Sequence, residues 1–296
     1  MKKCLIILNK SAGGSKKVSF EKVEACLGDC YDYTRCTLPD DPDPNPCGYD
    51  AVAVCGGDGT LGSVLSRVYD RSVDVWYFPV GTLNDKAKAE RYENAVTKCP
   101  SCGGESSGKQ IILGRCSNGE QKLFTYVFAC GAFTPIGYTA KIETKQKLGV
   151  LAYISRVLKE YKVHRIQARI DCGAECYEGE FALIMFVKSP RCFGFDFNRA
   201  FDADSTSGHL VAIRSPKHDG LLGKIEMFFP FFRTFFMGLK KEKDGKIIFK
   251  KVYSATLTHK DDTDYCRDGE KHFVKSGYHK ITFIRTMCNF NVIEKF

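Results

Sequence analysis

The chain has 296 residues, of which 44% are hydrophobic and 27% charged, as in ordinary globular proteins. That length suits two domains of usual size, and no apolar run approaches the roughly 18–20 residues that a membrane-spanning helix needs. The formal net charge of +9 is compatible with nucleic acid, an anionic membrane surface or phosphorylated ligands. No aromatic and basic signature of a known RNA-binding module is present, so we expect no nucleic-acid partner.

The first residues and the cysteines bear on the cellular compartment. Residues 1–9 join a basic start to an apolar run that is too short for a signal peptide and is typical of a buried strand. The fifteen cysteines are scattered, and an odd number without a secretion signal favours thiols in a reducing compartment. Cys99 and Cys102 form a C-x-x-C pair that Cys172 and Cys176 would have to complete as a zinc site, which is a weak signal. We therefore expect plain thiols and a cytoplasmic location.

The first hundred residues alternate strand and helix signals. Short apolar runs predict strands, and apolar spacing at every third or fourth position predicts helices. The four prolines between residues 39 and 46 exclude a regular helix there. The predicted strands cover 4–8, 31–37, 50–55 and 73–79, and the predicted helices cover 20–27 and 61–69. Such alternation predicts a doubly wound α/β domain, with a parallel sheet covered by helices.

The chain changes character near residue 105. Glycines and serines crowd residues 99–108, and many later runs alternate apolar with polar residues, which is typical of antiparallel strands. The predicted strands cover 110–113, 122–129, 164–171, 179–188, 209–214, 247–257 and 279–285, with one helix over 148–161. We therefore predict a first domain over 1–105, to which residues 286–296 can return, and an antiparallel second domain over 106–285.

The most informative stretch follows the predicted strand 50–55 and opens a helix. It reads Gly56-Gly57-Asp58-Gly59-Thr60. Glycines let the backbone approach a phosphate closely, and the N–H groups at a helix N-terminus favour an anion. Thr60 can cap the helix or donate to a phosphate oxygen, whereas Asp58 fits a polyphosphate site if it holds Mg²⁺, directly or through water. The alternative is a tight turn with Asp58 solvated, but five consecutive residues fit the phosphate site.

Five motifs follow one another in a recognisable order. They are Asn9-Lys10-Ser11-Ala12-Gly13-Gly14, then the Gly56 to Thr60 loop, Pro79-Val80-Gly81-Thr82-Leu83-Asn84-Asp85, Lys147-Leu148-Gly149-Val150-Leu151-Ala152-Tyr153 and Arg267-Asp268-Gly269-Glu270. No Walker A, protein-kinase or G-x-G-x-x-G pattern accompanies them. Together they resemble the diacylglycerol kinase catalytic-domain family of bacterial lipid kinases, which is related to sphingosine, ceramide and NAD kinases. The third motif is similar to the P-x-G-T-x-N-D loop of the lipid-kinase branch.

The resemblance implies an ATP- and Mg²⁺-dependent kinase that phosphorylates the hydroxyl of diacylglycerol or a related lipid alcohol. It also implies that the second domain is a β-sandwich and that ATP lies in the cleft between the domains. The residues implied around the phosphates are Asn9, Ser11, Gly13, Thr82 and Asn84, together with the Gly56 to Thr60 loop. Thr37 is implied to line the nucleotide, although Thr34 competes for the same place in the alignment.

Asp268 and Glu270 are assigned to the catalytic site by the same resemblance. A lipid hydroxyl is a poor nucleophile near neutral pH, so transfer needs positioning, Mg²⁺ and a proton acceptor. In an extended segment the two carboxylates would share one face, so that one accepts the proton while the other organises metal or water. The alternative is a β-turn in which Asp-Gly simply reverses the chain.

The segment from Phe228 to Lys243 bears on the lipid. We predict a helix with Pro230 in its first turn, followed by lysines. Its apolar face would carry Phe231, Phe232, Phe235, Phe236 and Leu239. Aromatic bulk beside lysines is typical of a peripheral contact with an anionic membrane, and the segment can also form the mouth through which a lipid enters. The alternative is that this helix packs against the second domain and its phenylalanines are core.

Departures from the family pattern leave alternatives open. Gly62-Ser63 stands where the family has Asn-Glu, the proline-rich segment replaces a helix, Ile112 stands where an aspartate is frequent, and Ser205-Thr206-Ser207-Gly208 replaces an Asp-Asp-Gly metal loop. Asp202 and Asp204 can compensate for the last change. A nucleotide- and lipid-binding regulator without catalysis is one alternative, and an NAD kinase, which the third motif argues against, is another. An exposed edge strand can also pair two copies into a homodimer.

Overall fold

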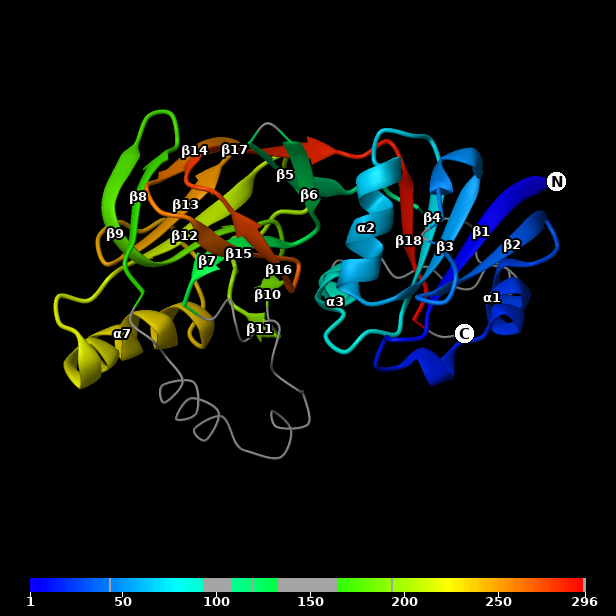
Figure 1. The fold of residues 1–296 in the computed structure, drawn as a ribbon, viewed down its shortest axis with the longest axis horizontal. Coiled ribbons are helices and arrows are strands. Elements are labelled where there is room, and N and C mark those ends of the chain that lie inside the picture. Colours follow the sequence, from blue (N-terminus) through cyan, green and yellow to red (C-terminus); the bar gives the residue numbers. More distant parts are fainter. Residues whose placement is uncertain (43, 93–107, 119, 133–163, 193, 295–296) are drawn as a thin grey trace. The chain divides into compact units, whose positions relative to one another are not determined.

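The computed structural model describes residues 1–296 apart from 43, 93–107, 119, 133–163, 193 and 295–296 (Figure 1). The chain divides into a first unit, Met1–Ile112 with Arg285–Phe296, and a second unit, Leu113–Ile284. The C-x-x-C pair at residues 99–102, the Lys147 to Tyr153 motif and the helix predicted over 148–161 lie outside the described residues.

The first unit is built on five parallel strands in the order β18-β4-β3-β1-β2. In chain order the strands are β1 (Lys2–Asn9), β2 (Tyr31–Leu38), β3 (Ala51–Gly56), β4 (Asp74–Pro79) and β18 (Asn289–Val292). The helices are α1 (Phe20–Leu27), α2 (Asp58–Val68) and α3 (Asp85–Tyr92), with short 3₁₀ turns at η1 (Ser15–Lys17) and η2 (Pro46–Gly48). The predicted α/β fold of this unit is confirmed.

Local sequence explains the helix ends. α1 follows Ser19, whose hydroxyl accepts the N–H of Lys22, and it ends at Gly28, whose φ of 82° favours glycine. α2 begins at Asp58, three residues before the predicted Leu61. The first turn of a helix tolerates glycine and polar residues because its N–H groups have no partner inside the helix.

The strand order places a switch point between β1 and β3. From β1 the chain crosses to β2, which pairs with one edge of β1, and then returns to β3 on the other edge. The loops after β1 and β3 therefore leave the same end of the sheet toward opposite sides. Open α/β sheets bind their ligands at such a point, and these two loops contain residues 9–14 and 56–60.

The second unit is an antiparallel sheet of eleven strands that curls on itself, as Figure 1 shows, and it realises the predicted all-β second domain. Its longest strand, β9, pairs with β7, β8 and β12, so it joins the parts of the curl. The strands are β5 (Ile112–Asn118), β6 (Glu120–Phe124), β7 (Val127–Gly131), β8 (Ile166–Asp171), β9 (Cys176–Val187), β12 (Gly208–Arg214), β13 (Ile247–Val252), β14 (Ser254–His259), β15 (Thr263–Arg267), β16 (Glu270–Val274) and β17 (Gly277–Arg285), beside the small pair β10 (Arg191–Cys192) and β11 (Phe195–Asp196).

Two predicted strands are each two strands in the structure. The run 122–129 is divided between β6 and β7, and the run 247–257 between β13 and β14. In both cases the chain changes partner at the break: β6 pairs with β5 but β7 with β9 and β15, while β13 pairs with β12 but β14 with β8 and β17. Periodicity within a run does not reveal such a change. The sequence reading also missed α3, β10, β11, β15, β16 and β18.

The helix α7 (Gly220–Phe235), yellow in Figure 1, packs against the sheet of the second unit. Met227, Phe231 and Phe235 are buried in a core shared with β9, β12 and β13. Pro230 lies inside the helix rather than in its first turn, so that prediction was wrong. A proline removes one hydrogen bond from a helix interior, and burial of the Pro230 ring offsets part of that loss.

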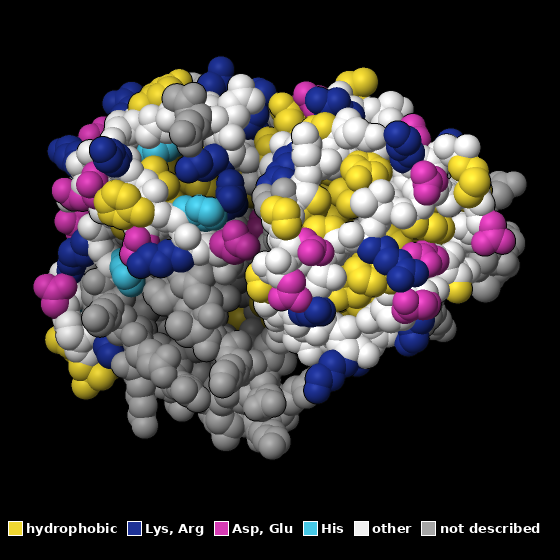
Figure 2. All heavy atoms as spheres, turned by 45° about the vertical axis from the view of Figure 1, so that its right-hand side comes forward, with side chains coloured by type: hydrophobic (Ala, Val, Ile, Leu, Met, Phe, Trp, Pro, Cys, Tyr) yellow, Lys and Arg dark blue, Asp and Glu magenta, His cyan; other side chains and the backbone are white. Residues whose placement is uncertain are grey.

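Surface and composition add two observations. No helix in the described part of the chain is long and apolar enough to cross a membrane. On the face shown in Figure 2, acidic and basic side chains are interspersed, so the net charge of +9 is not gathered there into one basic field.

Each of the thirteen described cysteines is a thiol. Burial raises the pKa of Cys4 and Cys130 to about 12, which makes these two poor nucleophiles.

Candidate functional site

The predicted phosphate-binding residues lie in three loops that follow neighbouring strands of the first unit. The first loop follows β1, the second follows β3 and the third follows β4, and these strands are adjacent and parallel. Thr37 lies near the end of β2, the next strand along, in register with Leu8. The four strand ends therefore bring together residues that are up to 75 positions apart, from Asn9 to Asn84.

Asn9 ties the first loop to the second. Its Nδ2 donates to Thr60 Oγ1 at 2.8 Å, and its Oδ1 accepts the N–H of Ser11 at 2.9 Å. Thr60 does not cap α2 as the sequence suggested, because the N-cap is Gly57 and no side chain accepts there. A Cβ on Gly56 would lie 2.7 Å from Thr60, so only glycine fits beneath this contact.

Backbone contacts tie the third loop to the other two. The N–H of Gly14 donates to Val80 O at 2.7 Å, and the N–H groups of Val80 and Gly81 both donate to Gly56 O, at 3.0 and 3.1 Å. A Cβ on Gly81 would lie 2.4 Å from the Cα of Gly57. The glycines of the motifs are therefore required because the loops touch backbone to backbone.

Three further residues predicted to surround the phosphates, Gly13, Thr82 and Asn84, complete this arrangement. A Cβ on Gly13 would lie 2.8 Å from Thr82 Oγ1, which brings the first and third loops together. Asn84 adopts a φ of 51°, and its Nδ2 donates to Pro79 O and Gly81 O at 3.1 and 2.9 Å. Asn84 thus shapes the third loop, in a conformation that asparagine adopts more readily than most residues.

Asp58 links the second loop to α3. Its two carboxylate oxygens accept the N–H groups of Asp85 and Lys86, at 2.9 and 3.1 Å, and its side chain is buried. The aspartate of the GGDGT loop therefore satisfies the N-terminus of the helix that follows the third loop. Within the described residues, no group of three or more His, Cys, Asp or Glu side chains has the arrangement of a metal site. The metal role of Asp58 stays a prediction.

A buried ion-pair network stabilises α3, and sequence reasoning missed it. Lys86 Nζ lies 2.7 Å from one oxygen of Glu90, and Lys109 Nζ lies 2.8 Å from the other. Burial acts to raise the pKa of Glu90, but the two lysines outweigh it and hold that pKa below its usual value. The spacing of Lys86 and Glu90, four residues apart, was the available signal.

The Asp268-Gly269 pair is the two-residue turn between β15 and β16. Arg267 pairs with Glu270 across it, and the φ values of 49° and 88° are those of a primed hairpin turn. Of the two possibilities left open by the sequence, an extended segment and a β-turn, the structure has the β-turn. Asp-Gly is the sequence that this turn favours, and the hairpin twist selects it.

The two carboxylates of the hairpin have opposite environments. Asp268 is buried, and its oxygens accept the N–H groups of Thr125, Tyr126 and Val127 at 2.5, 2.9 and 3.0 Å. Burial raises the pKa of Asp268, although these three donors oppose the shift. The Glu270 side chain is 58% exposed. Asp268 therefore fastens the turn to the segment before β7, whereas Glu270 is open to a ligand.

His272 lies beside Glu270 on β16. His272 Nε2 lies 3.9 Å from its carboxylate. Burial, and then the charges of Arg267 and Lys122, lower the pKa of His272 to about 4, so this imidazole is neutral at pH 7. A neutral imidazole forms no ion pair with the Glu270 carboxylate at pH 7.

The comparisons with known proteins bear on this site. Residues 3–116 match the family model described as the diacylglycerol kinase catalytic domain, and this range contains all three loops. Over these residues the chain is similar to the diacylglycerol kinase catalytic-domain family. It is 24% identical over 228 residues to the diacylglycerol kinase of Staphylococcus aureus strain RF122, covering 75% of this chain and 68% of that protein. The corresponding protein of Staphylococcus carnosus is 23% identical over 226 residues, covering 75% and 70%.

The solved structures agree on the fold. A crystal structure of a diacylglycerol kinase from Bacillus anthracis strain Sterne covers 98% of this chain and 96% of its own, with a TM-score of 0.64 and 16% identity. At that identity the likeness supports the two-unit architecture of the diacylglycerol kinase family and no finer property.

Residues 205–208 stand where the resemblance led us to expect an Asp-Asp-Gly metal loop. The buried Lys188 donates to Asp202 O and Ser205 O, at 2.7 Å each. The Asp202 carboxylate accepts the N–H groups of Asp204 and Ser205. A side-chain cation thus organises this loop, and Asp202 helps to fold it.

Proposed function

We propose that this chain is an ATP-dependent lipid kinase that transfers the γ-phosphoryl group to the hydroxyl of diacylglycerol or a related lipid alcohol. The observation that carries the proposal is the set of three interlocked loops at the carboxyl ends of β1, β3 and β4. The third loop meets the other two through backbone atoms and glycines, and glycine backbones allow a phosphate to approach closely.

The N-terminus of α2 supplies the donors. Gly57 is the N-cap, so the N–H groups that follow it have no acceptor inside the helix and carry the positive end of its dipole. From the first loop, Asn9 contacts Thr60 in the first turn of α2 and also accepts the N–H of Ser11, while Gly13 lies against Thr82 of the third loop. We infer that the β- and γ-phosphates bind there, and that Thr37 lines the nucleotide.

Mg²⁺ fits this site through Asp58. A carboxylate oxygen can accept more than one interaction, and Mg²⁺ usually retains several waters, so Asp58 can hold it through water while keeping its bonds to α3. When bound, Mg²⁺ supplies charge neutralisation on the transferring phosphoryl group.

The hairpin supplies the proton acceptor. Glu270 is the exposed carboxylate, so we assign it to receive the proton of the lipid hydroxyl as that oxygen attacks the γ-phosphorus. Asp268 holds the turn that presents Glu270 and is a positioning residue. Because the acceptor is a membrane lipid, we place the protein at the cytoplasmic surface of a membrane.

The test is phosphoryl transfer from γ-labelled ATP with Mg²⁺. The acceptors are diacylglycerol, ceramide, a sphingoid base and undecaprenol in mixed micelles, with NAD as a control. We expect a labelled lipid, and its identity names the substrate class. Labelled NADP, or ATP binding without any labelled lipid, would contradict the proposal.

A second function is favoured by one observation. Both aspartates of the predicted site, Asp58 and Asp268, accept backbone N–H groups, as structural carboxylates do. A nucleotide- and lipid-binding regulator would retain these contacts without turning over ATP. The same assay separates the two, since the regulator would bind ATP and lipid but transfer no label. Pairing of two copies through an edge strand stays a prediction.

A further inference from the structure

The first half of α7 carries a row of large apolar side chains that the second unit does not cover. Leu221, Leu222, Ile225 and Phe229 are 74%, 60%, 61% and 72% exposed. Leu221, Ile225 and Phe229 follow one another at intervals of four, so they lie on one face of the helix. The opposite face carries Gly223, Met227 and Phe231, which are buried. The exposed row is therefore the outer face of a helix whose inner face is fixed.

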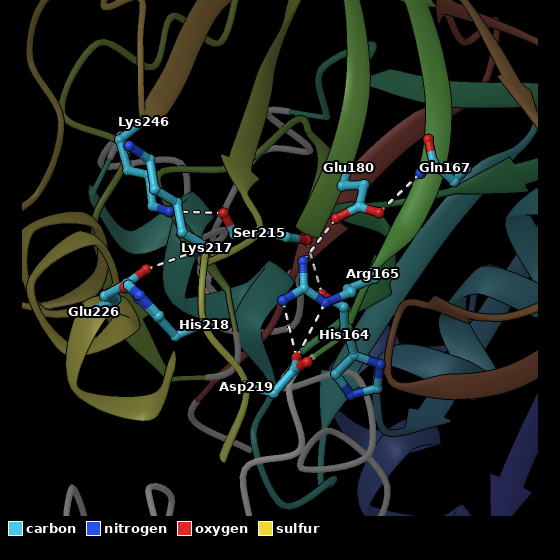
Figure 3. Close-up of polar contacts among 10 residues, drawn as sticks. All are labelled: His164, Arg165, Gln167, Glu180, Ser215, Lys217, His218, Asp219, Glu226 and Lys246. Atoms are coloured by element: carbon cyan, nitrogen blue, oxygen red, sulfur yellow. Dashed lines mark hydrogen bonds and ion pairs between the residues drawn. The ribbon is translucent and has the colours of Figure 1, made fainter. Parts of the chain in front are cut away.

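The strap that leads into this half of α7, residues 214–219, is firmly anchored, as Figure 3 shows. Ser215 Oγ donates to His164 O at 2.8 Å, and Lys246 Nζ donates to Ser215 O at 2.7 Å. The N–H of Lys217 donates to Glu226 at 2.8 Å, and His218 contacts the same carboxylate. The apolar row is thus presented by a rigid element, and a partner would meet it without having to order a loop.

The charges beside the row favour an anionic partner. Residues 214–225 contain three basic side chains and one carboxylate, that of Asp219, which Arg165 Nη2 approaches to 2.9 Å. The Glu226 carboxylate is engaged by the strap. Just beyond the other end of the helix, Lys240 and Lys241 are exposed. Asp219 and Glu226 both have basic partners, and lysines lie beside the apolar row and beyond the C-terminus of α7.

We propose that the outer face of α7, formed by Leu221, Leu222, Ile225 and Phe229, inserts into the surface of an anionic lipid bilayer. Exposed apolar side chains on a helix with lysines at its ends bind the boundary between headgroups and acyl chains, with the helix lying in the plane of the membrane. The proposal rests on the lipid-kinase function, whose acceptor is dissolved in such a bilayer. It also moves the contact predicted for the segment from Phe228 to Lys243 toward the N-terminal half of α7, since Phe231 and Phe235 are core.

The test is co-sedimentation of the full chain with vesicles, without ATP. The vesicles are phosphatidylcholine with and without phosphatidylglycerol. We expect binding to the anionic vesicles, weakened about tenfold by Phe229→Ser and about a hundredfold by Leu221→Ser with Phe229→Ser. Lys217→Gln is expected to weaken it about fivefold, and added salt to act in the same direction. Tyr253→Ser removes an aromatic side chain that is 62% exposed at the junction of β13 and β14, and is the matched control.

Three outcomes would overturn the proposal. In the first, the wild-type protein does not bind anionic vesicles. In the second, the double variant binds them as the wild type does. In the third, the wild type is a dimer without lipid and the double variant is a monomer, which would mean that a second copy of the chain covers this face. Ile225→Ser repeats the test if the double variant fails to fold, as judged by circular dichroism. Phosphoryl transfer to a short-chain, water-dispersed diacylglycerol separates the kinase proposal from the membrane-surface proposal. The variants should retain this activity. If the wild type binds vesicles but does not phosphorylate this lipid, the result contradicts the kinase proposal and leaves the membrane surface supported.

Discussion

The loops of the first unit and the hairpin of the second unit position their predicted residues in different ways. Each loop follows directly on its own strand, and parallel strands bring the loops together at one sheet end. The hairpin depends on Asp268, whose partners Thr125, Tyr126 and Val127 are more than 140 residues earlier in the chain. The comparison teaches that motif glycines indicate backbone contact, whereas a motif carboxylate can serve the fold, as Asp268 does.

The largest expected effect tests that division of work between the two carboxylates. Glu270→Gln should lower the rate of lipid phosphorylation by about 10²–10⁴-fold, because the hydroxyl loses its proton acceptor. Binding of ATP, measured by thermal shift, should not change. Glu178→Gln, at a side chain that is 70% exposed on β9, is the matched control and should leave the rate unchanged. A Glu270→Gln variant that keeps the wild-type rate would remove the catalytic role from this residue.

The next effect tests the backbone contact between the loops. Gly81→Ala places a methyl group 2.4 Å from the Cα of Gly57, so the loops must separate, at a cost of about 3 kcal/mol in the free energy of unfolding. ATP binding, measured by calorimetry, should be lost or strongly weakened. Gly48→Ala is the control, because nothing lies within 4 Å of its added Cβ. Equal ATP affinities of the two variants would break the proposed link between loop packing and phosphate binding.

A smaller effect tests the anchoring role of Asp268. Asp268→Asn turns an amide N–H₂ toward backbone N–H groups, so at least one donor loses its acceptor, and the free energy of unfolding should fall by about 2 kcal/mol. Urea denaturation measures this. Asp264→Asn, on the preceding strand β15, changes an exposed ion-pair partner of Lys271 and should cost well under half as much. If the Asp268 variant loses activity but no stability, Asp268 is catalytic rather than positioning.

The smallest effect concerns pH and stability in the second unit. Burial, and then the charges of Lys188 and Lys251, lower the pKa of His209 to about 4 in the folded protein, below its ordinary value of 6.5. Between pH 6.5 and pH 4, His209 is therefore protonated in the unfolded chain but neutral in the folded protein. The contribution of His209 to the free energy of unfolding is therefore fully present above pH 6.5 and is lost as the pH falls toward 4. At pH 5 the loss is on the order of 1–2 kcal/mol.

Urea denaturation at pH 7 and pH 5 checks this sign. His209→Gln should reduce, without abolishing, the loss of stability on acidification, since burial also lowers the pKa of His272 and His279 to about 4. A variant with the wild-type pH dependence would show that His209 titrates alike in the folded and unfolded states.

The sequence by itself determined the change from alternating strands and helices to antiparallel strands, and it located the three loops. Both follow from local patterns, since a buried strand is an apolar run and a loop that touches another backbone needs glycine. The family resemblance added the Asp268 and Glu270 pair.

Only the tertiary structure decided which side chains face what. Asp58 caps α3, Asp268 is enclosed by a distant segment, and α7 buries Phe231 while it exposes Phe229. The helix was predicted to begin at Pro230, yet it begins at Gly220, and its outer face is therefore formed by residues that the pattern from Phe231 onward did not include. Periodicity predicts that a helix has an apolar side. The side chains that cover each position come from elements far away in the chain, and spacing along the sequence does not identify them.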